Sequence, residues 1–360
     1  MSCRQYLQRA LTVLAVGLLL VSCGTPPDAS SPSEAPAASS AVTQSTADKP
    51  VTTSRPQSDA SFSGITFPLT ISDWNGNKTT FEHQPQRVIL ATGTAFNIWY
   101  DVGGEAIGST NRSENIKLLP EVSAAMQPLP QLGPTYGLDQ ESLVALNPDL
   151  VITTISTQDR LSKTLRDMGI KVINMTLRTQ DDIAMAYEIF GALNHNHDKA
   201  VDRIAQMSAK VDQVKAKFPS QDETKIVIVY VTSQALSVKL DTSIAGTMAK
   251  TLGLENVASG RTPNAPNSEH TPLDIEFLAQ TQPDVVLVTS MISNNEEAKA
   301  RLEASFASNS AWQAVDAVRA GKVYYLPQQY FLFNPGPYYP EALEYLAACI
   351  HPEIFGQPKV

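Results

Sequence analysis

One segment and its repeat 135 positions later constrain the fold of this 360-residue chain more than any other feature. The segments are residues 141–152 (ESLVALNPDLVI) and residues 276–287 (EFLAQTQPDVVL), and in each a Glu lies seven positions before Pro-Asp. The pattern predicts a short helix with an exposed Glu in its first turn, stopped at Pro148 or Pro283. The apolar run that follows predicts a strand buried on both faces of a parallel sheet. Two copies at this separation indicate two similar lobes.

The first 22 residues have the features of a bacterial export signal. Arg4 and Arg9 precede an apolar run at 11–21, which is shorter than the roughly 20 residues that a membrane-spanning helix needs. The run ends in LVSC at 20–23, the pattern of a lipobox, so we predict a lipoprotein signal peptide over 1–22 and lipid attachment at Cys23. An ordinary secretory signal with an incidental cysteine is the alternative. The Ser/Pro-rich stretch that follows favours the lipoprotein.

Residues 23–62 are rich in Ser, Ala, Pro and Thr and contain almost no large apolar side chains. Such a segment cannot bury enough surface to offset the entropy of ordering it. We therefore expect a flexible tether that holds a globular body away from a membrane. The domains that we predict after it are an N-terminal lobe at 63–180, linking helices at 181–219 and a C-terminal lobe at 220–360.

The formal net charge of −9 becomes −11 once Arg4 and Arg9 are removed with the signal. An acidic chain of this kind argues against nucleic acid as a partner. Of the three cysteines, Cys3 is lost with the signal and Cys23 is predicted to carry lipid, which leaves Cys349 alone. Stability must therefore come from core burial and not from a disulfide framework.

Strands and helices alternate along both predicted lobes, which is the signature of an α/β fold. A hairpin at 67–81 turns at Asn75-Gly76. The predicted strands of the first lobe are 87–91, 106–108, 151–154 and 171–174, with helices at 95–102 and 161–168. Those of the second lobe are 225–231, 285–289 and 323–326, with helices at 244–252 and 339–350.

Between the lobes lies a long helical tract with a polar break. Residues 181–193 and 199–218 read as helices, and 194–198 (NHNHD) separates them. In the second helix Ile204, Met207, Val211 and Val214 recur at spacings of three and four, which predicts one buried stripe.

At this point the chain resembles the solute-binding lipoproteins of ABC importers for iron complexes (siderophores and haem) and cobalamin. The resemblance covers residues 67–355 and rests on FPLTISD at 67–73, QRVIL at 86–90 and both Glu-x6-Pro-Asp segments. Further marks are TLGLENV at 251–257, Trp312 with GKVY at 321–324, and PGP at 335–337. It implies an α/β fold of two Rossmann-like lobes with mostly parallel sheets, joined by a single long α-helix, of the class III periplasmic-binding-protein type.

The resemblance also implies where such a protein works and with which partners. We expect a monomer held by the lipid on Cys23 at the extracytoplasmic face of the bacterial cell membrane. Its partners would be the permease and ATPase subunits of an importer, and it would have no cofactor of its own. Glu141 and Glu276 would dock onto arginines of the permease, one Glu on each lobe. Their alternative role is a favourable charge at the start of a solvated helix.

Ligand contacts are expected from loops at the carboxyl ends of the strands, where open α/β sheets bind their ligands. In the first lobe the candidates are Thr92, Gly93, Thr94, Phe96, Tyr100, Thr135 and Tyr136. In the second lobe they are Thr232, Ser233, Asp241, Ser243, Ser290, Met291 and residues 330–334, which include Tyr330, Phe331 and Asn334. The aromatic side chains of that last segment could face a macrocycle or an aromatic chelator.

The ligand classes are ranked with a ferric siderophore first, then haem, then cobalamin. Tyr136 and His270 are the candidate axial ligands for haem, because one lies shortly before each docking Glu. Haem-binding relatives often have Tyr directly after the glycine that corresponds to Gly133, and this chain has Pro134 there. That departure weakens the haem interpretation.

Two further functions find little support in the sequence. His195 and His197 lie in a polar break between helices, and we interpret them as a solvated turn instead of a metal site. An exported enzyme would be expected to show a Gly-x-Ser-x-Gly, His-Glu-x-x-His, Walker or dinucleotide motif, and the chain has none of these. We therefore expect a binding protein and not an enzyme.

Overall fold

The computed structural model describes residues 66–113, 115–265, 268–292, 295–333 and 335–359. The predicted signal peptide, Cys23 and the tether at 23–62 lie outside the described residues, and so does Asn334. Among the helices of the described part, none combines the length and the apolar character needed to cross a membrane.

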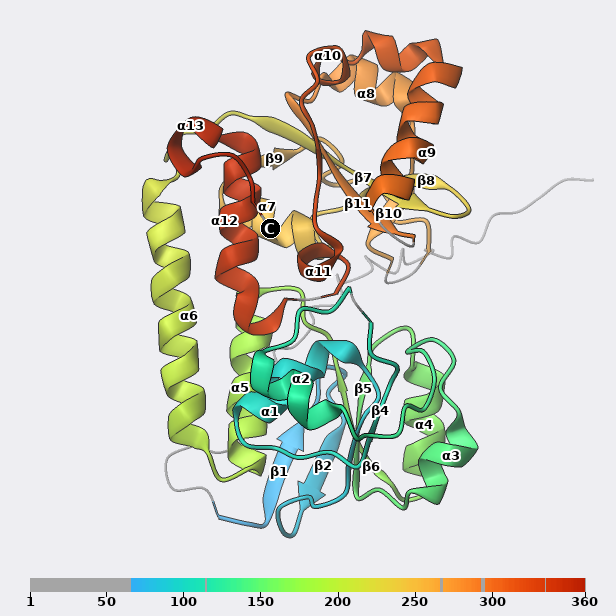
Figure 1. The fold of residues 1–360 in the computed structure, drawn as a ribbon, viewed down its shortest axis with the longest axis vertical. Helices are drawn as coiled ribbons and strands as arrows, with labels where there is room; N and C mark the ends of the chain where they lie inside the picture. The colour runs from blue at the N-terminus through green and yellow to red at the C-terminus, as the bar shows by residue number, and fades with distance from the viewer. Residues whose placement is uncertain (1–65, 114, 266–267, 293–294, 334, 360) are drawn as a thin grey trace, which may run out of the picture. The chain divides into compact units, whose positions relative to one another are not determined.

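The N-terminal lobe, which contains the labelled strands β4, β5 and β6 in Figure 1, is built on a four-stranded parallel sheet in the order β4-β3-β5-β6. Its strands are β3 (Val88–Leu90), β4 (Gly108–Ser109), β5 (Leu150–Thr154) and β6 (Lys171–Met175). The predicted hairpin is present as β1 (Leu69–Ser72) paired antiparallel with β2 (Lys78–Phe81). The helices of this lobe are α1 (Phe96–Asp101), preceded by the 3-10 turn η1 (Gly93–Ala95), α2 (Pro120–Met126), α3 (Gln140–Ala145) and α4 (Asp159–Asp167).

The C-terminal lobe is built on a six-stranded sheet in the order β10-β8-β7-β11-β12, with β9 also paired to β7. Its strands are β7 (Lys225–Thr232), β8 (Leu236–Lys239), β9 (Glu255–Asn256), β10 (His270–Pro272), β11 (Val285–Met291) and β12 (Val323–Tyr325). Only β8 runs antiparallel to β7, so the sheet is mostly parallel, as predicted. The helices of this lobe are α7 (Ile244–Thr251), α8 (Ile275–Thr281), α9 (Asn295–Ser308), η2 (Ser310–Ala314), α10 (Asp316–Arg319), α11 (Gln328–Phe331), η3 (Gly336–Tyr338), α12 (Tyr339–Ile350) and α13 (Pro352–Phe355).

Helices α5 (Gln180–Leu193) and α6 (His197–Lys217) connect the two lobes. With 21 residues, α6 is about 30 Å long at 1.5 Å per residue. It packs against both α5 and α12. In the predicted stripe Met207, Val211 and Val214 are buried, and Ile204 packs partly buried against the same core.

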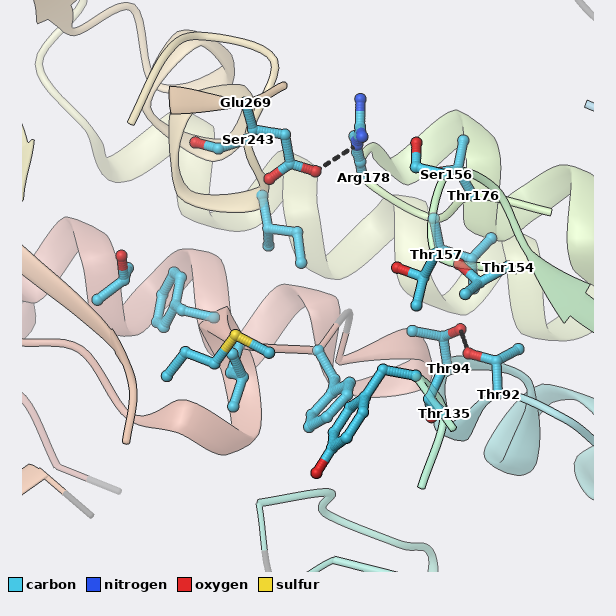
Figure 2. A pocket seen from close by; sticks show the side chains of 18 of the residues that line it. Thr92, Thr94, Thr135, Thr154, Ser156, Thr157, Thr176, Arg178, Ser243 and Glu269 are labelled. Atoms are coloured by element: carbon cyan, nitrogen blue, oxygen red, sulfur yellow. Dashed lines mark hydrogen bonds and ion pairs between the residues drawn. The ribbon is translucent and has the colours of Figure 1, made fainter. Parts of the chain in front are cut away.

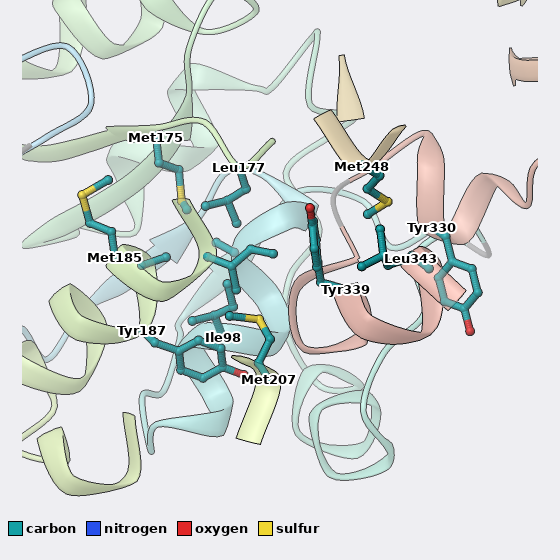
Figure 3. Packing of buried hydrophobic residues seen from close by; sticks show 14 of the residues in the cluster. Ile98, Met175, Leu177, Met185, Tyr187, Met207, Met248, Tyr330, Tyr339 and Leu343 are labelled. Atoms are coloured by element: carbon teal, nitrogen blue, oxygen red, sulfur yellow. The ribbon is translucent and has the colours of Figure 1, made fainter. Parts of the chain in front are cut away.

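One hydrophobic cluster continues from the N-terminal lobe through the connecting helices into the C-terminal lobe. Figure 3 shows Ile98 and Met175 of the first lobe, Met207 of α6, and Tyr339 and Leu343 of α12 as members of this cluster. Because the cluster is continuous, a large separation of the lobes would expose apolar surface to water.

The repeated Glu-x6-Pro-Asp segments form the predicted helix followed by a strand in both lobes, α3–β5 and α8–β11. The helices end at Ala145 and Thr281, and a residue with positive φ lies directly before each proline: Asn147 (47°) and Gln282 (45°). The aspartates after the prolines fix the neighbouring strands. Asp149 accepts hydrogen bonds from the backbone N–H groups of residues 86 and 87, and Asp284 accepts one from that of Lys225 (2.9 Å).

The loop between α6 and β7 is joined to the segment between α12 and α13 through His351, which we expect to make stability depend on pH. Burial alone lowers the pKa of His351, but hydrogen bonds from its ring to Asp222 and Glu353 outweigh that effect and leave the pKa above 6.5. Because the pKa is raised in the folded state, protonated His351 stabilises the fold. This stabilisation is complete below about pH 6.5 and is lost as the pH rises through the folded pKa.

We therefore expect the free energy of unfolding to fall above about pH 6.5, by about 1 kcal/mol from this group. Urea titrations between pH 6 and about 8 measure it. The His351→Gln variant should lack this part of the decline. Equal pH dependence in the wild type and the variant would contradict the assignment.

Candidate ligand-binding site

A cavity of about 690 Å³ lies at the carboxyl ends of the parallel strands of both sheets. The loops after β3, β4, β5 and β6 form one side of it. The other side comes from Tyr230 on β7, the end of β11, the start of α7, the loop before β10, and residues 331–333 at the end of α11. The cavity therefore occupies the edge at which the sequence analysis expects a ligand.

Gln158 organises the loops beneath the cavity. Its side chain is 3% exposed. Its amide nitrogen donates to the carbonyls of Ala91 and Thr135, both at 2.8 Å, and its amide oxygen accepts from the backbone N–H of Thr154 at 2.9 Å. One buried side chain thus joins the loops after β3 and β5 to the loop that carries Tyr136. Such a fully bonded buried amide fixes loop positions.

Hydroxyl groups dominate the N-terminal side of the cavity. Figure 2 shows Thr92, Thr94, Thr135, Thr154, Ser156, Thr157 and Thr176 on this side. The hydroxyls of Thr92 and Thr94 are 2.9 Å apart and hydrogen-bonded. Hydroxyls both donate and accept, so this wall can pair with amide, hydroxyl or carboxylate groups of a ligand without carrying charge.

Tyr136 stands at the tip of a tight turn beside these hydroxyls. The turn is closed by a hydrogen bond of 2.8 Å from the N–H of Gly137 to the carbonyl of Pro134. It begins at Gly133, where φ is +102° and an added Cβ would lie 2.8 Å from the carbonyl oxygen of Gly137, so a larger residue does not fit. The side chain of Tyr136 is 78% exposed, which leaves its ring available to a ligand.

A further part of the wall, formed by both lobes, carries charge. Glu269, in the loop before β10, forms ion pairs with Arg178 (2.8 Å) and with Lys239 (3.3 Å), as Figure 2 shows for Arg178. Arg112 also lines the cavity, and its guanidinium donates to the backbone carbonyls of Met126 and Gln127. The described lining residues therefore include three cations and one carboxylate, although the chain as a whole has a net charge of −9.

Tyr230 and His270 form an aromatic pair next to Lys239 and Glu269. Their rings meet edge to face at 5.5 Å, and the ammonium of Lys239 lies 4.1 Å from the centre of the Tyr230 ring. Burial, and next the charge of Glu269, raise the pKa of Tyr230 to about 12. Burial, and next the charge of Lys239, lower the pKa of His270. Both rings are therefore neutral at neutral pH.

Several residues proposed from the sequence line the cavity. They are Thr92, Thr94, Thr135 and Tyr136 in the first lobe and Ser243, His270, Ser290, Met291 and Phe331 in the second. Ser243 and Ser290 are held by other contacts: Ser243 caps the start of α7 through the N–H of Gly246, and Ser290 accepts from Gln328.

Other residues proposed from the sequence lie away from the cavity, and these assignments are corrected. Phe96 is the first residue of α1 and is 0% exposed in the core, while Tyr100 on the same helix is half-buried against that core. Tyr330 is 4% exposed, and its hydroxyl accepts a hydrogen bond of 2.8 Å from Lys117. Ser233 lies in an exposed turn. Asp241 accepts from Asn256 and Ser259 and fixes a loop.

The charged part of the wall was missed by sequence reasoning. Arg178, Lys239 and Glu269 lie in three different segments, and no motif in the sequence connects them. The only available signal was position, since Arg178 follows a predicted strand, at the carboxyl end where ligands bind. Within the described ranges, no group of three or more His, Cys, Asp and Glu side chains is arranged to hold a metal ion.

The two repeated glutamates lie outside the cavity lining. Glu141 is exposed in the first turn of α3, whose N-cap Asp139 accepts from the N–H groups of Glu141 and Ser142. Glu276 is exposed in the first turn of α8, whose N-cap Asp274 accepts from the N–H of Phe277. The two glutamates thus have the same local geometry in the two lobes.

Two α/β lobes joined by a long helix, with a cavity at the carboxyl ends of both sheets, define a two-lobed binding protein. Residues 88–330 match the profile of the family described as "Periplasmic binding protein". The chain belongs to this family, and its fold is the class III form. The resemblance inferred from the sequence, to the solute-binding proteins of ABC importers for iron complexes and cobalamin, is confirmed.

Two relatives match most of the chain. A Bacillus subtilis protein named "Uncharacterized ABC transporter substrate-binding lipoprotein YvrC" is 23% identical over 299 residues, 80% of this chain and 87% of the relative. A "Cobalamin-binding protein" of Halobacterium salinarum is 23% identical over 286 residues, 79% of this chain and 74% of the relative.

Solved structures agree on the fold. IsdE of S. aureus, solved in complex with heme, has a TM-score of 0.64 at 17% identity and covers 73% of this chain and 98% of its own. An ABC-type Fe3+-hydroxamate transport protein of Saccharomonospora viridis has a TM-score of 0.62 at 20% identity, with coverages of 79% and 99%. At these identities the likeness establishes the fold.

Proposed function

We propose that this chain is the extracytoplasmic substrate-binding protein of an ABC importer and that it captures a ferric siderophore between its two lobes. Membership of the periplasmic binding protein family supports the general role of a substrate-binding protein. The cavity itself, lined by hydroxyls and by a net positive wall in an acidic chain, is the observation that carries the ligand class. Many ferric siderophore complexes are polar and anionic, and they need no side-chain ligand to iron because the chelator supplies all of them.

The state of His270 favours a chelate over haem. Its two ring nitrogens lie 3.1 Å from the amide nitrogen of Asn264 and 3.2 Å from the hydroxyl of Ser268, at hydrogen-bond distance. Axial ligation of haem would have to break one of these contacts. Haem stays the second candidate because Tyr136 and His270 both line the cavity from different lobes, and because a structural neighbour is solved with heme.

Cobalamin is the third candidate, supported by the relative named as a cobalamin-binding protein. Cyanocobalamin has no net charge, and the single phosphodiester of its nucleotide loop is the one anionic group that it offers to Arg178 and Lys239. The charge of the wall therefore ranks it below the siderophore.

The absorption spectrum of protein purified from its native host tests the ligand class. Broad charge-transfer absorption is expected from a ferric chelate. A Soret band would replace the siderophore with haem, and corrin bands would replace it with cobalamin. Thermal unfolding with added ligand then quantifies binding, since saturation at 100 times Kd stabilises the folded state by about 2.7 kcal/mol.

The remaining parts of the proposal concern delivery. The protein acts as a monomer without a cofactor or catalytic activity, and it passes its ligand to a permease that an ATPase subunit drives. Glu141 and Glu276 contact the permease, one from each lobe. The lipid on Cys23 holds the protein at the extracytoplasmic face of the membrane, which the name of the Bacillus subtilis relative as a lipoprotein supports.

The Cys23→Ala variant is expected to move from the membrane fraction to the soluble fraction. The acyl chains on Cys23 supply the apolar surface that holds the protein, and two chains are needed for stable anchoring. Fractionation should be done in a strain without the permease, so that docking does not retain the variant. Membrane retention of the variant in that strain would show that Cys23 is not the anchor.

A further inference from the structure

Glu269 lies inside the cavity and neutralises two cations that belong to different lobes. Arg178 follows β6 in the first lobe, whereas Lys239 ends β8 in the second. Each oxygen of the Glu269 carboxylate pairs with one cation: Oε1 pairs with the guanidinium of Arg178, and Oε2 pairs with the ammonium of Lys239. The side chains are 28%, 16% and 24% exposed for Arg178, Lys239 and Glu269, so all three are mostly withdrawn from water.

The two cations are fixed from several sides. The N–H of Arg178 donates to Asp182 (3.0 Å), and its carbonyl accepts from the hydroxyl of Thr247 in the second lobe (2.7 Å). Lys239 is also held over the ring of Tyr230. Two cations so placed form a preorganised receptor for one anionic group, because charge-assisted bonds from both converge on the same carboxylate.

We propose that Glu269 is an internal counter-ion: in the empty protein its carboxylate occupies the position that an anionic group of the ligand takes on binding. In the empty protein it occupies Arg178 and Lys239. On binding, a carboxylate or catecholate oxygen of an anionic ferric chelate takes over both cations, and the Glu269 side chain turns away. The inference deepens the proposed function and rests on it.

This exchange makes Glu269 a determinant of specificity. An anionic chelate replaces two ion pairs by two others, so the exchange is nearly balanced. A neutral chelate gives the cations no new partner, and it must either leave Glu269 in the cavity or break its ion pairs without compensation. Arg178 and Lys239 thereby favour anionic chelates over neutral ones, and Glu269 lowers the affinity for anionic chelates by competing for the same two cations.

The test measures the affinity of the full chain for two iron chelates of different charge, anionic ferric enterobactin and neutral ferrichrome. Glu269→Gln keeps the shape of the side chain but frees both cations. We expect it to strengthen binding of ferric enterobactin by about tenfold or more, the worth of one charge-assisted contact, and to change binding of ferrichrome by less than about threefold. Each ratio compares a variant with the wild type for the same chelate, so differences in chelate shape cancel.

Three further variants complete the design. Arg178→Gln should weaken binding of ferric enterobactin by about tenfold. Glu255→Gln and Arg160→Gln make the same charge changes at exposed positions outside the cavity lining and should leave both affinities unchanged. Circular dichroism confirms that each variant is folded.

The outcomes separate the two proposals. A selective gain for ferric enterobactin in Glu269→Gln supports the counter-ion. Weaker binding of ferric enterobactin in this variant, or equal changes for both chelates, overturns it and leaves the siderophore proposal standing. Absence of binding of either chelate to any of the folded proteins overturns the siderophore and the counter-ion together.

Discussion

The Glu141→Ala, Glu276→Ala double variant is expected to lose import while keeping its affinity for the ligand. Both side chains are exposed in the first turn of a short helix, and neither lines the cavity. Their matching positions in the two lobes suit a permease that presents one basic site to each lobe. Breaking a desolvated carboxylate–guanidinium pair costs about 2–5 kcal/mol, whereas an exposed pair is worth only about 0.2–1 kcal/mol. Two desolvated pairs together are enough to abolish productive docking.

Import and ligand affinity must be measured on the same proteins. The single variants should import at reduced rates, because each keeps one contact. The Glu82→Ala, Glu255→Ala double variant removes the same charge from two other exposed positions, one in each lobe, and should import normally. Loss of ligand affinity in the Glu141, Glu276 double variant would instead assign these carboxylates to ligand binding.

The parallel strands were predicted well from the sequence because each is marked by an apolar run within its own residues. An unbroken apolar run such as residues 150–152 is typical of a strand buried between two layers, and β5 contains this run. The pair β8 and β10 was not predicted. Their antiparallel pairing joins Lys239 to His270, and β10 ends at Pro272, a residue that discourages a strand assignment. A pairing between distant segments leaves no periodic signal in either one.

The candidate site could be located from the sequence but not resolved into side chains. Topology places the carboxyl ends of parallel strands on one edge, and loops proposed from the sequence line the cavity there. Within a loop, the direction of a side chain depends on one or two dihedral angles. Tyr330 and Phe331 are neighbours in the single turn of α11, yet the hydroxyl of Tyr330 bonds to Lys117 while Phe331 lines the cavity. The ion pairs of Glu269 depend on contacts between lobes, which one sequence does not reveal.

The contact between the first lobe and the connecting helix depends on one buried carboxylate. Asp101, at the end of α1, is 2% exposed. It accepts from the hydroxyl of Tyr187 on α5 (2.9 Å) and pairs with Arg203 (2.9 Å) and Lys199 (3.3 Å) on α6. The hydrogen bond from Arg203 to Asp101 is the main reason that the pKa of Arg203 is raised. A carboxylate satisfied from three directions holds both connecting helices against the first lobe.

Asp101→Ala is expected to lower the free energy of unfolding by about 2–4 kcal/mol, because it leaves a buried phenol and two cations without their shared acceptor. The value lies somewhat below that for a fully buried pair, since Arg203 and Lys199 are 37% and 43% exposed and can turn to water. Asp101→Asn keeps an acceptor for Tyr187 but no charge, and should lose about half as much. Asp202→Ala removes an exposed carboxylate from α6, beside Arg203, and should change stability by less than about 0.5 kcal/mol. Urea unfolding of the four proteins gives these differences. A loss in Asp101→Ala no larger than in Asp202→Ala would mean that the hydrophobic cluster alone holds the helices in place.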